Sequence, residues 1–150
     1  MQDDFTQFFR SAIIRRWKTT ANLTALVPAG RIFPPRVADK PTWPYVALES
    51  PTLDNFPISG GPANLVDFRG HCYARTEGQG GTTKDGEVEA QKIARQMMLA
   101  LEDPLTFADT GYTGDPANIL VTWERTQVIG EPGSKTDFHG IIDFQAMIVT

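Results

Sequence analysis

The 150-residue chain has one cysteine, Cys72, and only two histidines, His71 and His139. A single cysteine excludes a disulfide within the chain and any cysteine-based zinc cluster that one chain could supply. No apolar run approaches the roughly 20 residues that a bilayer-spanning helix needs, so we expect no membrane contact. Asp3 and Asp4 stand where a secretion signal has its basic head, which predicts that the protein is made in a cytoplasm.

Motifs for nucleophilic or nucleotide chemistry are also missing. No Gly-x-Ser-x-Gly sequence announces a strained nucleophile turn. The glycine-rich stretch 78–84 lies between a predicted strand and a predicted helix, but Lys84 follows the threonines, whereas a phosphate loop requires Gly-Lys-Ser/Thr. We therefore interpret this stretch as a flexible loop and expect no bound cofactor.

One row of polar residues is a candidate for hydrolytic chemistry. Asp137, His139 and Asp143 are separated by even numbers of residues in the last predicted strand, so they share one face. A solvated sheet face explains this row more simply, because the chain lacks a helical His-Glu-x-x-His arrangement. His71 and Cys72 project to opposite strand faces and cannot chelate one ion. We predict no metal and no enzymatic activity, with a small hydrolase on the row as the alternative.

The charge distribution is uneven. The net charge is −4, yet the first 20 residues hold four of the 14 basic groups and two of the 18 acidic groups. Sequence-independent binding of nucleic acid needs clustered Lys and Arg, and only this first segment offers any. The remaining acidic body argues against tight DNA binding, although it suits a wall past which DNA must slide.

Length and composition fit one domain spanning residues 1–150. The hydrophobic share is 41% and the charged share 21%, both ordinary for a globular chain. A chain of this size buries roughly 70% of its unfolded surface, which is enough for a core without disulfides.

Periodicity predicts two long helices. In residues 3–20 apolar side chains recur every three or four positions, with acids at the start and bases near the end. Residues 87–101 repeat this spacing, and Pro104 follows. Two proline-rich segments, 31–44 and 51–63, are expected to be an extended connector and a long exposed loop.

Four segments have the pattern of strands: residues 45–49, 64–75, 119–129 and 138–149. The second and fourth alternate cleanly, which is typical of a sheet with one buried face. The order helix, strand, strand, helix, strand, strand predicts an α+β fold. We expect a mainly antiparallel sheet of about four strands with the two long helices packed on one face.

Four segments, which cover nearly the whole chain, carry a resemblance to a known family. They are LTALVPAGRIFPPRVADKPTWPYVALES (residues 23–50), LVDFRGHCYAR (65–75), GEVEAQKIARQMMLALEDPLTF (86–107) and DFHGIIDFQAMIVT (137–150). In order and spacing they resemble the tail-completion, or tail-terminator, proteins of long-tailed bacteriophages, which also occur in phage-like gene transfer particles.

The resemblance implies a structural protein of the virion neck that is assembled in the host cytoplasm. Such proteins form a six-fold ring on the tail tube protein, stop tube polymerisation, and provide the surface on which the head-tail connector or stopper protein docks. DNA passes through the lumen without specific binding. If the ring forms, we expect the acidic excess to line this lumen and repel the phosphates. A head-tail joining or connector protein, or another phage adaptor, is the alternative.

Loops on a compact sheet, and an exposed helix, are the usual places for partner contacts. The residues that we predict to contact partners are Arg15, Arg16, Trp17, Arg36, Trp43, Phe56 and Ile58.

Overall fold

The structure is a computed structural model that describes residues 2–37, 39–58, 61–79, 82–108, 110–112 and 118–149. Within these ranges, the side chains of residues 2–5, 53–58, 61–64, 79 and 82–84 are not described.

Two long helices and two short ones make up the helical part. Helix α1 spans Gln2–Thr19, and α3 spans Gly86–Leu99. Helix α2 (Ala21–Thr24) and the 3-10 turn η1 (Ala29–Arg31) follow α1 directly. Helix α3 begins at the N-cap Asp85, whose carboxylate accepts hydrogen bonds from the backbone N–H groups of Glu87 and Val88. The cap satisfies two donors that have no partner inside the helix.

Seven of the nine strands in the described ranges form one mixed sheet. The order is β1-β2-β4-β9-β8-β7, and β3 also pairs with β4. Strands β1 and β2 are parallel, whereas the other pairs are antiparallel. Strands β5 and β6 form a separate hairpin. The strands are β1 Ile32–Phe33, β2 Tyr45–Leu48, β3 Thr52–Ile58, β4 Gly61–Arg75, β5 Glu77–Gln79, β6 Thr82–Lys84, β7 Leu105–Thr106, β8 Asn118–Gly130 and β9 Asp137–Val149.

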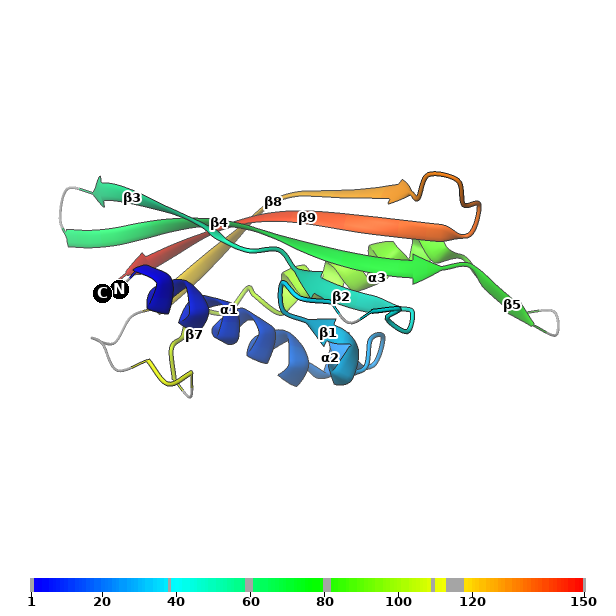
Figure 1. Ribbon diagram of the computed structural model, residues 1–150, viewed down its shortest axis with the longest axis horizontal. Helices are drawn as coiled ribbons and strands as arrows, with labels where there is room; N and C mark the ends of the chain where they lie inside the picture. The colour runs from blue at the N-terminus through cyan, green and yellow to red at the C-terminus, as the bar shows by residue number, and fades with distance from the viewer. Residues whose placement is uncertain are drawn as a thin grey trace.

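The core lies between one face of this sheet and the helices (Figure 1). The even-numbered residues of β4 and β9 are buried from Val66 to Ala74 and from Gly140 to Ile148. Gly70 lets Trp17 of α1 and Met97 of α3 approach the strand, because a Cβ there would lie 2.8 Å from Met97 Cε. The Trp17 indole N–H donates to the carbonyl of Met97 and joins the two helices. Both long helices therefore pack on the same face of β4.

The α+β class is confirmed, but the prediction of about four strands was wrong, because the described residues form a mixed sheet of seven strands. Strands β1 and β7 have only two residues each, too few for a periodic pattern. We expected residues 51–63 to be an exposed loop because of their prolines. In the structure, β3 and the start of β4 pair as an antiparallel hairpin instead. Pro57 of the edge strand β3 pairs with Pro62, and an edge strand tolerates a missing N–H. Strands β5 and β6 likewise pair with each other where we expected a flexible loop.

Within the described part of the chain, no helix is long and apolar enough to cross a membrane.

Candidate assembly surface

Odd-numbered residues of β4 and β9 form the face of the sheet opposite the helices. Here His71 and His139 contact each other across the two strands, with 2.7 Å between Nδ1 of His71 and Nε2 of His139. Glu49 lies 3.5 Å from the other nitrogen of His71, and Glu131 lies 3.2 Å from that of His139. Two carboxylates therefore flank a pair of imidazoles in one row on the open face.

Aromatic rings extend the row at the β2 side of the sheet. Tyr73 stacks on His139 at 4.2 Å between ring centroids and on Tyr45 at 4.4 Å. The Trp43 ring meets Tyr73 edge-on at 5.8 Å and carries the Arg75 guanidinium 4.3 Å above it. Stacking, edge-on and cation–π contacts of this kind each favour the observed ring orientations.

Burial among these rings disfavours the charged forms of the titratable groups. Desolvation lowers the pKa of His71, and desolvation with the nearby His71 lowers the pKa of His139 to about 4. The same desolvation, with the neighbouring Tyr45, raises the pKa of Tyr73 to about 12. Near neutral pH the two histidines and the tyrosine are therefore uncharged.

Ion pairs continue the face toward β8. Arg69 donates to the Asp143 carboxylate at 2.6 Å, and Arg125 of β8 lies 3.4 Å from the other oxygen of Asp143. Gln145 donates to Asp67 at 3.2 Å. Asp143 therefore bridges Arg69 and Arg125 and offsets one of their two positive charges.

The side chains of Asp137, His139 and Asp143, which we considered as a possible hydrolase site, do not converge. Arg75 binds Asp137 at 2.7 Å, Arg69 binds Asp143, and His139 contacts His71 and Glu131 instead of either aspartate. Four residues along a strand separate side chains by about 13 Å, too far for shared acid-base chemistry. The described residues also contain no cluster of His, Cys, Asp or Glu suited to a metal ion.

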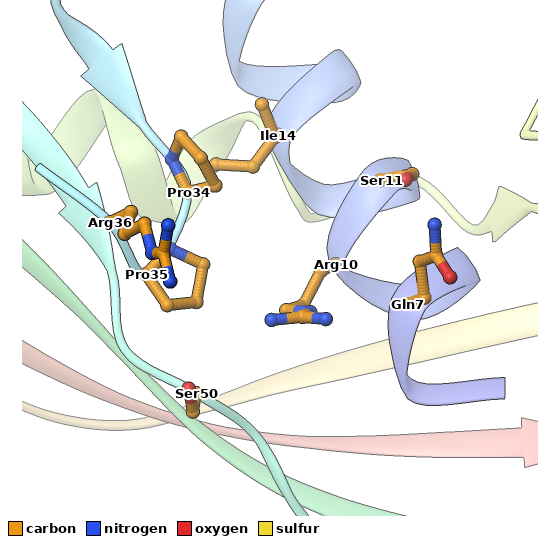
Figure 2. A pocket seen from close by; sticks show the side chains of 8 residues that line it. All are labelled: Gln7, Arg10, Ser11, Ile14, Pro34, Pro35, Arg36 and Ser50. Atoms are coloured by element: carbon orange, nitrogen blue, oxygen red, sulfur yellow. The ribbon is translucent and has the colours of Figure 1, made fainter. Parts of the chain in front are cut away.

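A second feature lies near the end of β2, between α1 and the segment that follows β1. A cleft of about 550 Å³ opens there between Gln7, Arg10, Ser11 and Ile14 of α1 and residues Pro34, Pro35, Arg36 and Ser50 (Figure 2). Arg10 and Arg36 come from the two opposite walls. We call this feature the arginine cleft.

A family model for tail completion protein gp17 matches residues 11–149. The match extends over the second half of α1, all of α3 and the whole sheet. The chain belongs to the tail completion protein gp17 family. This confirms the resemblance found in the sequence and identifies a structural protein of the phage tail, located in the virion.

Solved structures share the fold of this gp17 family member. One of them is a chain of the virion of a native gene transfer agent (GTA) particle, 17% identical, with a TM-score of 0.69. The alignment covers 94% of each chain. A search of the curated proteins finds no significant match.

The structure places the predicted contact residues of helix α1 in different roles. Trp17 is 0% exposed and holds α1 against α3, which corrects the prediction that it contacts a partner. Arg16 donates hydrogen bonds to the carbonyls of Ala100, Asp103 and Pro104, so it stabilises the end of α3. Arg15 is exposed. A partner contact through Arg15 stays a prediction.

The other predicted residues are spread over the sheet edge. Arg36 is exposed and lines the arginine cleft. Trp43 lies half-buried in the aromatic row. Phe56 and Ile58 belong to strand β3, and their side chains lie outside the described ones.

Two parts of this surface escaped the sequence interpretation. The contact between His71 and His139 depends on the register of β4 with β9, in which Tyr73 pairs with His139 and His71 with Ile141. In both strands the buried positions have even numbers and the histidine has an odd number, so the alternation places both histidines on the open face. The alternation does not set the distance between them. Arg10 looked like one of several charges on an amphipathic helix, and no local signal relates it to Arg36.

Proposed function

We propose that this chain assembles into a ring of six copies that caps the tail tube, ends tube polymerisation and provides the docking surface for the head connector. The observation that carries the proposal is the match of residues 11–149 to the tail completion family. The role is structural, so the proposal includes no catalytic step.

The surface chemistry supports a contact role. The open face of the sheet is held by ring stacking and by ion pairs such as Arg69 with Asp143, so its shape is set before any partner arrives. A preorganised surface loses little side-chain entropy on binding. Unlike a catalytic site, it needs no convergent nucleophile and base.

A ring also requires an interface that joins two different patches of identical subunits, because a head-to-tail contact closes only when the rotation per subunit fits. The tube protein and the connector or stopper protein are the proposed partners on the two sides of the ring. DNA passes through the lumen, where the net charge of −4 disfavours retention of phosphates.

Light scattering of the purified protein, alone and mixed with tail tubes, followed by electron microscopy, tests this function. We expect a closed ring, or density that caps one end of each tube. A protein that stays monomeric and ignores tubes contradicts the proposal. Binding to the connector without binding to tubes assigns the chain to head-tail joining instead.

A further inference from the structure

The arginine cleft holds two positive charges without a visible counter-ion. Within the described part of the chain, neither Arg10 nor Arg36 makes an ion pair or a hydrogen bond, although the sequence has 18 acidic and 14 basic groups. The two guanidinium groups approach the same space from opposite walls (Figure 2). Two like charges that face one cleft repel each other, and an anionic group between them relieves this repulsion.

The other walls of the cleft indicate what kind of anion fits. Pro34, Pro35 and Ile14 provide apolar surface, and Gln7, Ser11 and Ser50 provide short polar groups. A bare phosphate would leave the apolar walls of the cleft without a contact. A carboxylate next to an aromatic side chain matches both kinds of wall, since prolines and aliphatic side chains pack well against a ring.

The chain itself carries such a pair at the opposite edge of the sheet. The register of β8 with β9 shifts between Trp123 and Arg125, so Glu124 is the extra residue of a bulge. Trp123 is 48% exposed, and its indole N–H donates to Thr126 Oγ1 at 2.7 Å. Glu124 is exposed and, among the described residues, makes no ion pair or hydrogen bond. Bulges commonly re-aim side chains at sheet edges.

Within one chain the bulge and the cleft stand on different elements, although Ser50 borders both the cleft and the cavity that Glu124 lines. Strands β4 and β9 separate β2, next to the cleft, from β8, which is a distance of roughly 14 Å at the usual strand spacing. Beyond Ile119, no described strand pairs with the outer side of β8, so this edge is open to a neighbour. Complementary patches on opposite edges of one sheet are what a head-to-tail contact between identical subunits requires.

We propose that the bulge of one copy docks into the arginine cleft of the next copy. The Glu124 carboxylate accepts hydrogen bonds from Arg10 and Arg36, and the Trp123 ring packs against Pro34 and Pro35. This inference rests on the proposed ring and names the contact between its subunits. Because guanidinium-carboxylate pairs are directional, the contact also sets the rotation from one subunit to the next.

Charge reversal and restoration test the contact. We expect Glu124→Arg, and separately Arg10→Glu with Arg36→Glu, to weaken ring formation at least about tenfold, since like charges then face each other. All three changes in one chain restore opposite charges and should recover most of the association. Arg95→Glu and Glu77→Arg, exposed positions away from both patches, are the matched controls. Circular dichroism confirms that each variant is folded.

A crosslink provides a second measurement that does not depend on charge. Arg36→Cys and Glu124→Cys proteins, mixed and oxidised, should form a disulfide-linked dimer that neither variant forms alone. The native Cys72 is 0% exposed and gives little background. Glu77→Cys mixed with Arg36→Cys is the control and should give none.

The outcomes separate this inference from the proposed function. Rings that persist in Glu124→Arg, with no crosslink, overturn the contact and leave the ring standing. If the arginine reversals abolish binding to tubes but not ring formation, the cleft receives a different protein, and the inference is wrong. A wild-type chain that forms no ring, alone or on tubes, overturns both proposals.

Discussion

Nδ1 of His71 and Nε2 of His139 lie 2.7 Å apart across strands β4 and β9, on a face where burial lowers the pKa of both imidazoles. Glu49, Asp143 and Arg69 face His71, and Glu131 contacts His139. The carboxylates favour protonation of His71, but they do not outweigh the desolvation. This balance makes the stability of the fold depend on pH.

We expect the free energy of unfolding to fall as the pH is lowered from about 6.5 toward 4, because the unfolded chain binds a proton at His139 in this range and the folded chain does not. One such group contributes at most about 1.4 kcal/mol per pH unit, and the effect of His139 ends below its folded pKa of about 4. Urea unfolding at several pH values measures the slope.

The variant His139→Gln is the control for this dependence, since an amide of similar size does not titrate. Its slope between pH 6.5 and 4.5 should be shallower than that of the wild type. Parallel slopes for the two proteins would contradict the assignment to His139.

Gly140 is packed so tightly that a methyl group should not fit. A Cβ at this position would overlap Cys72 Sγ, which itself donates to the Ala90 carbonyl at 3.4 Å in the core. We expect Gly140→Ala to lower stability by about 1–3 kcal/mol through overpacking. In Cys72→Ala the sulfur is removed, so Gly140→Ala should cost much less in that background. Equal costs in both backgrounds, by urea unfolding, would show that Cys72 is not the obstacle.

We expect Trp17 to contribute to the free energy of unfolding and not to contacts with partners. The ring is fully buried, and its indole N–H donates to the carbonyl of Met97 at 3.1 Å. We expect Trp17→Ala to cost about 3–5 kcal/mol, as large-to-small core substitutions do. Lys18→Ala, at the exposed neighbouring position, should change stability by less than about 0.5 kcal/mol. A stable Trp17→Ala protein would contradict the core role.

The N-cap Asp85 should stabilise the start of helix α3. Asp85→Ala removes the acceptor for the N–H groups of Glu87 and Val88, and we expect a loss of about 1 kcal/mol. Asp85→Asn keeps an acceptor oxygen and should retain most of the stability. Thermal unfolding of the three proteins checks this order, and an equal loss in both variants would argue against the cap.

Sequence patterns predicted most of the long elements because each carries its own period. The alternation in residues 64–75 and 138–149 predicted a sheet with one buried face, and in the structure the even-numbered residues from Val66 to Ala74 and from Gly140 to Ile148 are buried. Proline was a poor guide in residues 51–63, because the edge strand β3 accepts Pro57 without losing a ladder hydrogen bond. Two-residue strands such as β1 and β7 carry no period at all.

Candidate surface residues were harder to predict, because exposure depends on distant elements. Trp17 and Arg16 are neighbours in sequence, yet one lies in the core and the other binds carbonyls after α3. Amphipathic spacing already placed Trp17 on the apolar stripe of its helix. It did not show that α3 and Gly70 cover that stripe completely.

The sequence by itself determined the two long helices and the alternation of buried and open positions in the long strands, because these follow from local spacing. It also determined the α+β class and membership of the tail completion family, because these follow from the order of segments along the chain. Only the tertiary structure decided which residues meet. The contact of His71 with His139 and the bulge at Glu124 depend on strand register, and the cleft shared by Arg10 and Arg36 depends on how α1 packs beside the segment after β1. Register and order are set by the packing of the whole sheet against its helices, so no local stretch of sequence contains them.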